Sequence, residues 1–98
     1  MSKRNSNQTT LKEAIDRLLQ AYKLKGKMQE LDIVSSWEQI MGRTIAKRTK
    51  DLYIKDKVLV VKLDSSVLRE ELQMGKSKII ELINQHAGEE VVNEIILK

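Results

Sequence analysis

Cationic side chains between residues 43 and 57 are the strongest candidates for chemistry in this sequence. The stretch joins a predicted helix end to a predicted hairpin, so its side chains can point outward together. Only Asp51 and Asp56 oppose them. Lysine and arginine neutralise phosphates in a sequence-independent, salt-sensitive way. We therefore expect phosphate contacts from six cations: Arg43, Lys47, Arg48, Lys50, Lys55 and Lys57.

Two smaller basic groups accompany this stretch. Lys23, Lys25 and Lys27 lie at a predicted turn between two helices, and Lys76 and Lys78 form another group. Residues 1–62 carry 14 basic and 7 acidic side chains, a net +7, while residues 63–98 carry 4 and 7, a net −3. Such an asymmetry suggests a polyanionic partner for part of the surface. The alternative is that these charges only solvate the surface.

Other kinds of chemistry have little support in the sequence. The chain has no cysteine and one histidine, so a thiolate or histidine-rich metal site is excluded. Gly75-Lys76-Ser77 resembles the end of a phosphate loop, but Glu70 stands where the first glycine is needed. We therefore expect no enzyme activity, no cofactor and no small-molecule substrate. His86 reads as a residue that compensates a helix dipole.

The apolar runs are too short to cross a membrane. The longest, Val58 to Val61, is far below the roughly 20 residues that a bilayer requires. The polar N-terminus has no apolar stretch behind Lys3 and Arg4, so we expect a cytoplasmic protein with no membrane contact.

The elements that position these cations follow from periodicity. Residues 1–9 are expected to be a flexible polar tail and residues 10–98 a single domain. Thr10 and Glu13 fit a capping box, and an apolar stripe follows at helical spacing. The stripe consists of Leu11, Ala14, Ile15, Leu18, Leu19 and Tyr22. Gly26 is expected to end this helix.

The remaining chain predicts helices and strands around one sheet. We expect a second helix over 27–41, strands over 52–54 and 58–63 in a hairpin, a long helix over 67–86 with Gly75 inside it, and a strand over 91–97. Met28, Leu31, Val34, Trp37, Ile40 and Met41 are expected to line the inner face of the second helix. The fold class is α+β in the order α-α-β-β-α-β, a three-stranded sheet with helices packed on one face.

A series of motifs at defined spacing runs along most of the sequence. Trp37-Glu38-Gln39-Ile40-Met41-Gly42 is followed by Ile45-Ala46, by Thr49, by the hairpin, and by Leu63-Asp64-Ser65-Ser66 with a helix through Glu71-Leu72. This pattern, over about residues 10–98, closely resembles the DciA-type bacterial replication proteins. The family was formerly catalogued as a domain of unknown function. The resemblance implies a fold similar to the K-homology (KH) domain, although no G-x-x-G loop is present. Many relatives carry an extension beyond the domain.

The resemblance also implies a function. It predicts a non-enzymatic accessory protein that binds DNA, single-stranded or duplex, together with the replicative DNA helicase and assists helicase loading. Two alternatives stay open on the residues alone. One is a KH-like RNA-binding factor, and the other is a protein-interaction module without nucleic acid.

Overall fold

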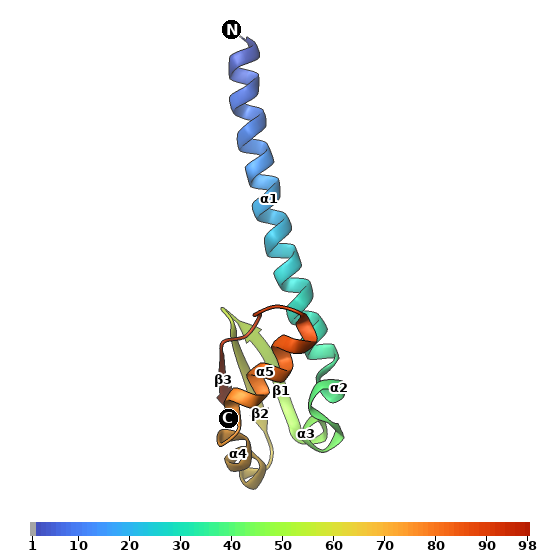
Figure 1. Cartoon of the computed structure of the whole chain (residues 1–98). Coiled ribbons are helices and arrows are strands. Elements are labelled where there is room, and N and C mark those ends of the chain that lie inside the picture. Colours follow the sequence, from blue (N-terminus) through green and yellow to red (C-terminus); the bar gives the residue numbers. More distant parts are fainter. Residues whose placement is uncertain (1) are drawn as a thin grey trace.

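A computed structural model describes the backbone of residues 2–98 and the side chains of residues 10–98. Five helices and three strands follow one another along this part of the chain (Figure 1). They are α1 (Ser2–Ser35), α2 (Trp37–Met41), α3 (Arg43–Arg48), β1 (Thr49–Lys55), β2 (Val58–Leu63), α4 (Ser66–Gln73), α5 (Lys76–Ala87) and β3 (Glu94–Leu97). The predicted α+β class and the order of helices and strands are confirmed.

Helix α1 is longer than the sequence pattern indicated. It begins at Ser2, so Thr10 and Glu13 lie inside it and do not cap its start. It also continues through Gly26, where the sequence predicted a turn between two helices. A glycine inside a helix costs only about 1 kcal/mol relative to alanine. That cost does not end a helix whose later turns are fixed by burial of Ile33. The flexibility of residues 1–9 stays a prediction.

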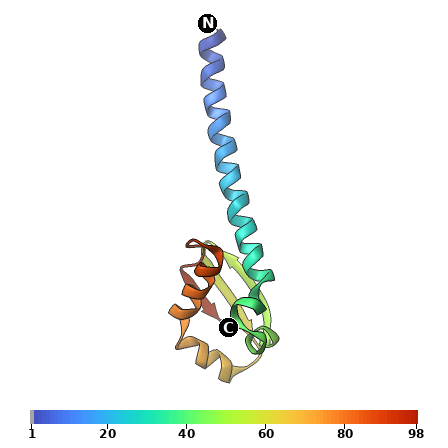
Figure 2. The same ribbon diagram turned by 45° about the vertical axis from the view of Figure 1, so that its right-hand side comes forward.

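Most of α1 stands clear of the rest of the chain. Figures 1 and 2 show its N-terminal two thirds projecting away from the sheet and the other helices. The principal extents of 69 × 21 × 19 Å reflect this projection. Met28 and Leu31, predicted on an inner face, are 68% and 66% exposed. The inward face of this region is instead formed by Ile33 and Trp37.

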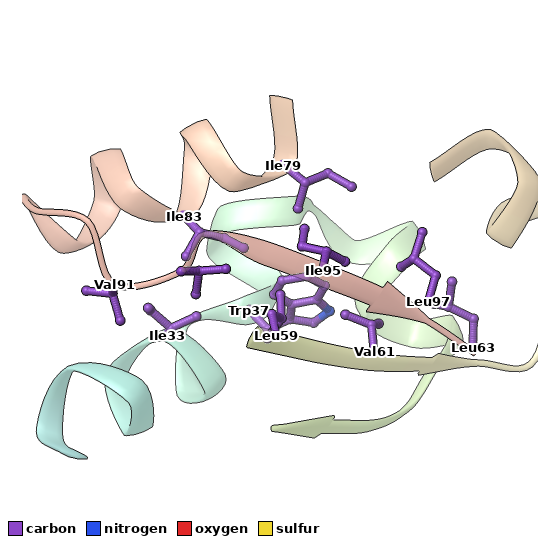
Figure 3. Close-up of a cluster of buried hydrophobic side chains, with 11 residues drawn as sticks. Ile33, Trp37, Leu59, Val61, Leu63, Ile79, Ile83, Val91, Ile95 and Leu97 are labelled. Carbon is purple, nitrogen blue, oxygen red and sulfur yellow. The ribbon is translucent and has the colours of Figure 1, made fainter. Parts of the chain in front are cut away.

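The core lies between one face of the sheet and the helices. Leu59, Val61 and Leu63 alternate along β2 and all point into it, as expected for a strand that is buried on one face. Trp37 is 5% exposed, so its predicted place in the core is confirmed. Figure 3 shows these side chains meeting Ile33, Ile79, Ile83, Val91, Ile95 and Leu97. Val92 also belongs to this cluster.

The sheet has the strand order β1-β2-β3. β1 pairs with β2 in antiparallel register, and β3 pairs with β2 in parallel register. Tyr53, Val60 and Ile96 are aligned across the three strands on the face away from the core. Tyr53 and Ile96 are exposed there, so the helices cover only the opposite face.

Gly75 interrupts the predicted long helix. α4 ends at Gln73 and α5 begins at Lys76, with Gly75 as the residue before α5. The Cβ position of Gly75 has no neighbour within 4 Å, so the sheet does not pack closely against this glycine. Gly88 ends α5 with a φ of 80°, in the left-handed region that favours glycine. The Ser65 hydroxyl accepts a hydrogen bond from the Leu68 amide and caps α4.

Candidate nucleic-acid interface

Four of the predicted cations gather where α3 meets β1. Arg43, Lys47 and Arg48 belong to α3, and Lys50 follows at the start of β1, where the pairing with β2 is irregular. Arg48 Nη1 lies 3.8 Å from Asp64 Oδ1, and Lys50 Nζ lies 3.3 Å from Asp64 Oδ2. The single carboxylate of Asp64 thus pairs with two cations, so the four basic residues and Asp64 together keep a net positive charge. All four basic residues are exposed.

Three more cations gather at the other end of β1. Lys23 and Lys27 of α1 and Lys55 of β1 line one shallow hollow of about 360 Å³. Glu30 and Asp56 line the same hollow, so its charge is partly balanced. The juxtaposition arises because the last turns of α1 run beside β1 (Figure 1).

Lys25 and Lys57 have a different surrounding. Lys25 Nζ lies 3.7 Å from Glu89 Oε1, and Gln29 donates a hydrogen bond to the same carboxylate. The hydrogen bond from Gln29, then the charge of Lys25, lower the pKa of Glu89, and Lys57 adds a smaller effect. These two lysines therefore face an acidic residue near the end of α5 and are less available to an external anion.

The predicted cations thus form two groups along β1 and not one converging cluster. Lys50 and Lys55 are five residues apart on this strand, which is about 16 Å at 3.3 Å per residue. Between them, a groove of about 230 Å³ separates β1 from α1. Leu31, Val34, Leu52, Tyr53 and Ile54 supply its apolar walls. Lys76 and Lys78 lie at the start of α5, away from this strand in sequence, and Lys78 is paired with Glu81.

Two features of this surface were missed by sequence reasoning. Asp64 entered the sequence prediction only as part of the family motif, but it pairs with two of the cations. Tyr53 was not among the predicted contact residues, and its place beside a groove between two basic groups depends on how α1 runs. No local signal in the sequence reports that path, because it is set by long-range packing.

The described side chains offer no other candidate centre. No group of three or more His, Asp or Glu side chains among residues 10–98 is arranged to hold a metal ion. Within the described part of the chain, no helix has the length and apolar character needed to cross a membrane.

Comparison with known proteins agrees with the motifs. The family model described as "Dna[CI] antecedent, DciA" matches residues 10–97. A UPF0232 protein from Corynebacterium glutamicum (strain R) is 32% identical over 63 residues, which are 64% of this chain and 35% of that protein. The chain therefore spans about one third of the length of this relative. The match over almost the whole chain confirms the resemblance, and the chain belongs to the DciA family.

Proposed function

We propose that this chain is a non-enzymatic accessory protein of bacterial DNA replication that binds DNA phosphates along β1 and assists loading of the replicative helicase. Membership of the DciA family supports a role in replication. The DNA contact is supported by the charges on β1 and its neighbours. The helicase contact is supported by the family likeness alone.

The observation that carries the DNA proposal is the placement of cations at both ends of β1. Arg43, Lys47, Arg48 and Lys50 mark one end, and Lys23, Lys27 and Lys55 mark the other. The roughly 16 Å between Lys50 and Lys55 corresponds to about five nucleotides at 3.4 Å each along one strand. A short stretch of nucleic acid laid along β1 would meet both groups.

The local chemistry suits a reversible contact. The ion pairs of Arg48 and Lys50 with Asp64 are exposed, and exposed pairs contribute about 0–1 kcal/mol. A phosphate can replace the carboxylate at little cost. Tyr53 is 42% exposed beside the groove, and an aromatic ring so placed can stack on a base. Affinity is expected to come mainly from released counterions, with little sequence preference.

Fluorescence anisotropy with labelled single-stranded and duplex DNA tests the DNA contact. We expect binding at low salt that weakens steeply as salt rises. Lys47→Gln with Lys50→Gln should weaken binding about tenfold or more and make the salt dependence shallower. Lys27→Gln with Lys55→Gln should do the same from the other end of β1. No binding at low salt, or an affinity indifferent to salt, contradicts the proposal.

A matched control keeps the change of net charge constant. Lys76→Gln with Lys78→Gln removes two positive charges at the start of α5 and should leave the affinity within about twofold. An equal loss in the control would mean that net charge alone governs binding. A clear preference for RNA over DNA of equal length would favour the RNA-binding alternative.

The helicase contact requires its own measurement. Purified replicative helicase from the same organism, mixed with the chain, should form a complex that resists the Lys47→Gln, Lys50→Gln exchange. A chain that binds DNA but never the helicase would retain the DNA part of the proposal and lose the loading part.

A further inference from the structure

Helix α1 carries an apolar stripe that no other side chain among residues 10–98 covers. Leu11, Ile15, Leu18 and Tyr22 recur at alternating steps of four and three residues, with Leu19 beside them. These five side chains are between 49% and 66% exposed. Steps of this kind place side chains along one seam of a helix and are typical of helix pairs that pack knobs into holes. Most helical stability in water comes from packing such a face.

Charged residues leave this seam free. Between residues 11 and 22 the charged side chains are Lys12, Glu13, Asp16 and Arg17. Only Lys12 lies next to the seam in the heptad pattern, while Glu13, Asp16 and Arg17 fall on the far side. Glu13 and Arg17 pair with each other at 3.8 Å on that side. Ala14 and Ala21 border the seam and allow a second helix to approach closely.

The same seam continues into a contact that the chain already makes. One and two heptad steps further on, it presents Lys25, Gln29 and Asp32. These face the end of α5, where Lys25 and Gln29 contact Glu89 and where Asp32 Oδ2 lies 2.9 Å from His86 Nε2. α5 thus covers the lower part of the seam, and the part from Leu11 to Tyr22 extends above it (Figures 1 and 2).

We propose that the uncovered part of the seam, Leu11 to Tyr22, pairs with the same segment of a second copy of this chain in an antiparallel helix dimer. A two-fold axis between Asp16 and Arg17 sets Leu11 against Tyr22 and Ile15 against Leu18, so that every apolar position of the seam meets an apolar partner. Such an interface is self-complementary, as a symmetric dimer requires.

Repulsion between basic side chains favours the antiparallel direction. In a parallel pair, the second α1 would lie over Lys25, Gln29 and Asp32, which already contact Glu89 and His86. The pair would also bring Lys23, Lys25 and Lys27 of both copies together, at a cost in repulsion. In the antiparallel pair, residues 2–8 of the second helix also reach this level, but Lys23, Lys25 and Lys27 of the two copies stand apart.

The area available predicts a weak, concentration-dependent dimer. Five large apolar side chains that are about half to two thirds exposed offer roughly 500 Å² per copy, the size of the largest apolar patch on a typical monomer. A pair would bury roughly 1,000 Å², the lower limit for a specific interface. We therefore expect a dissociation constant in the micromolar range or weaker, so that the dimer is populated only at high protein concentration.

Sedimentation equilibrium of the full chain tests the dimer. We expect a monomer at about 1 μM and a growing dimer fraction up to several hundred micromolar. Ile15→Glu with Leu18→Glu should raise the dissociation constant at least about 100-fold. Both side chains are exposed and outside the core, so thermal unfolding of the domain should not change. Val67→Glu with Met74→Glu places the same charges on exposed apolar positions of the α4 region and should leave the dimer intact.

Disulfide trapping tests the direction, because the native chain has no cysteine. A mixture of the Leu11→Cys and Tyr22→Cys chains should form the mixed disulfide under mild oxidation. Leu11→Cys alone should not cross-link, since its two copies would be about 16 Å apart along the pair and a disulfide needs Cα atoms within about 7 Å. A chain that stays monomeric at several hundred micromolar overturns the proposal. Efficient cross-linking between two Leu11→Cys chains overturns the antiparallel direction.

Discussion

The indole of Trp37 donates a hydrogen bond from Nε1 to the hydroxyl of Thr49, at 3.0 Å, and Thr49 in turn donates to the carbonyl oxygen of Ile45 at 2.7 Å. This relay links α2, the last turns of α3 and the first residue of β1. It sets the direction in which the chain leaves α3, so it positions Arg48 and Lys50 on either side of Thr49. The motif Trp37, Ile45, Thr49 that led to the family thus has a structural basis.

Thr49→Val should destabilise the fold by about 1–3 kcal/mol. The substitution preserves the shape of the side chain but leaves the indole N–H of a 5% exposed Trp37 without its acceptor. Urea unfolding followed by tryptophan fluorescence measures this loss. Thr49→Ser preserves the hydroxyl and is the matched control, with an expected loss below about 1 kcal/mol. A loss in Thr49→Val that is smaller than the loss in Thr49→Ser would mean that the methyl group contributes more to this junction than the relay does.

Asn84 has a comparable role at the other side of the core. Its Oδ1 accepts hydrogen bonds from the amides of Val91 and Val92, at 2.9 and 3.0 Å, and its Nδ2 donates to the Val92 carbonyl at 2.8 Å. The loop between α5 and β3 makes these bonds in place of a regular ladder. Val91 and Val92 are buried, so water does not readily replace the asparagine.

Asn84→Ala should therefore cost about 2–4 kcal/mol, because two buried amides lose their acceptor. Hydrogen exchange at the amides of Val91 and Val92 should accelerate more than exchange in β2. Asn84→Asp preserves the acceptor and loses only the donated bond, so its exchange rates at these amides should fall between those of the native chain and the alanine variant. Unchanged protection in Asn84→Ala would contradict this assignment.

Glu89 should titrate below its ordinary pKa of 4.5, because Gln29 donates to its carboxylate and Lys25 lies beside it. A lowered pKa in the folded chain means that the contact stabilises the fold above pH 4.5 and is lost as the pH falls through the lowered value. NMR titration of the Glu89 carboxyl group measures the midpoint directly. Gln29→Leu should return the midpoint toward 4.5 more than Lys25→Met does, since the hydrogen bond has the larger effect. A midpoint at or above 4.5 in the native chain would exclude the contact.

The sequence patterns predicted the sheet better than the first helix. The strand expected over residues 58–63 has the observed bounds of β2, because a strand buried on one face leaves a clear alternating pattern in the sequence. Periodicity in α1 indicated a helix but not its partner, since an amphipathic stripe is the same whether its own core or another chain covers it. Gly26 was expected to end the helix. A glycine permits the backbone to leave the helical conformation but does not require it to do so.

The candidate interface was likewise predicted only in part from the sequence. Local spacing identified the basic residues from Arg43 to Lys57, and the charges do lie on exposed positions. It did not reveal that β1 separates them into two groups, nor that Lys23 and Lys27 join Lys55. Those relationships arise from the packing of α1 beside β1, between residues about 30 positions apart. Pairing of this kind depends on the whole core and not on any local signal.

The hairpin between β1 and β2 turns through Asp56 and Lys57, which have φ angles of 52° and 64°. Both lie in the left-handed region, where a residue with a Cβ atom costs about 1–2 kcal/mol relative to glycine. Aspartate is one of the residue types that tolerate this region, whereas lysine is not one of them. Lys57→Gly should therefore stabilise the fold by about 0.5–1 kcal/mol, less than the full strain because glycine also gains freedom in the unfolded chain. Urea unfolding measures the gain, and Lys55→Gly, at the last strand position, is the matched control and should destabilise. A loss of stability in Lys57→Gly would mean that the lysine side chain, which lies near Glu89, contributes more than its backbone strain costs.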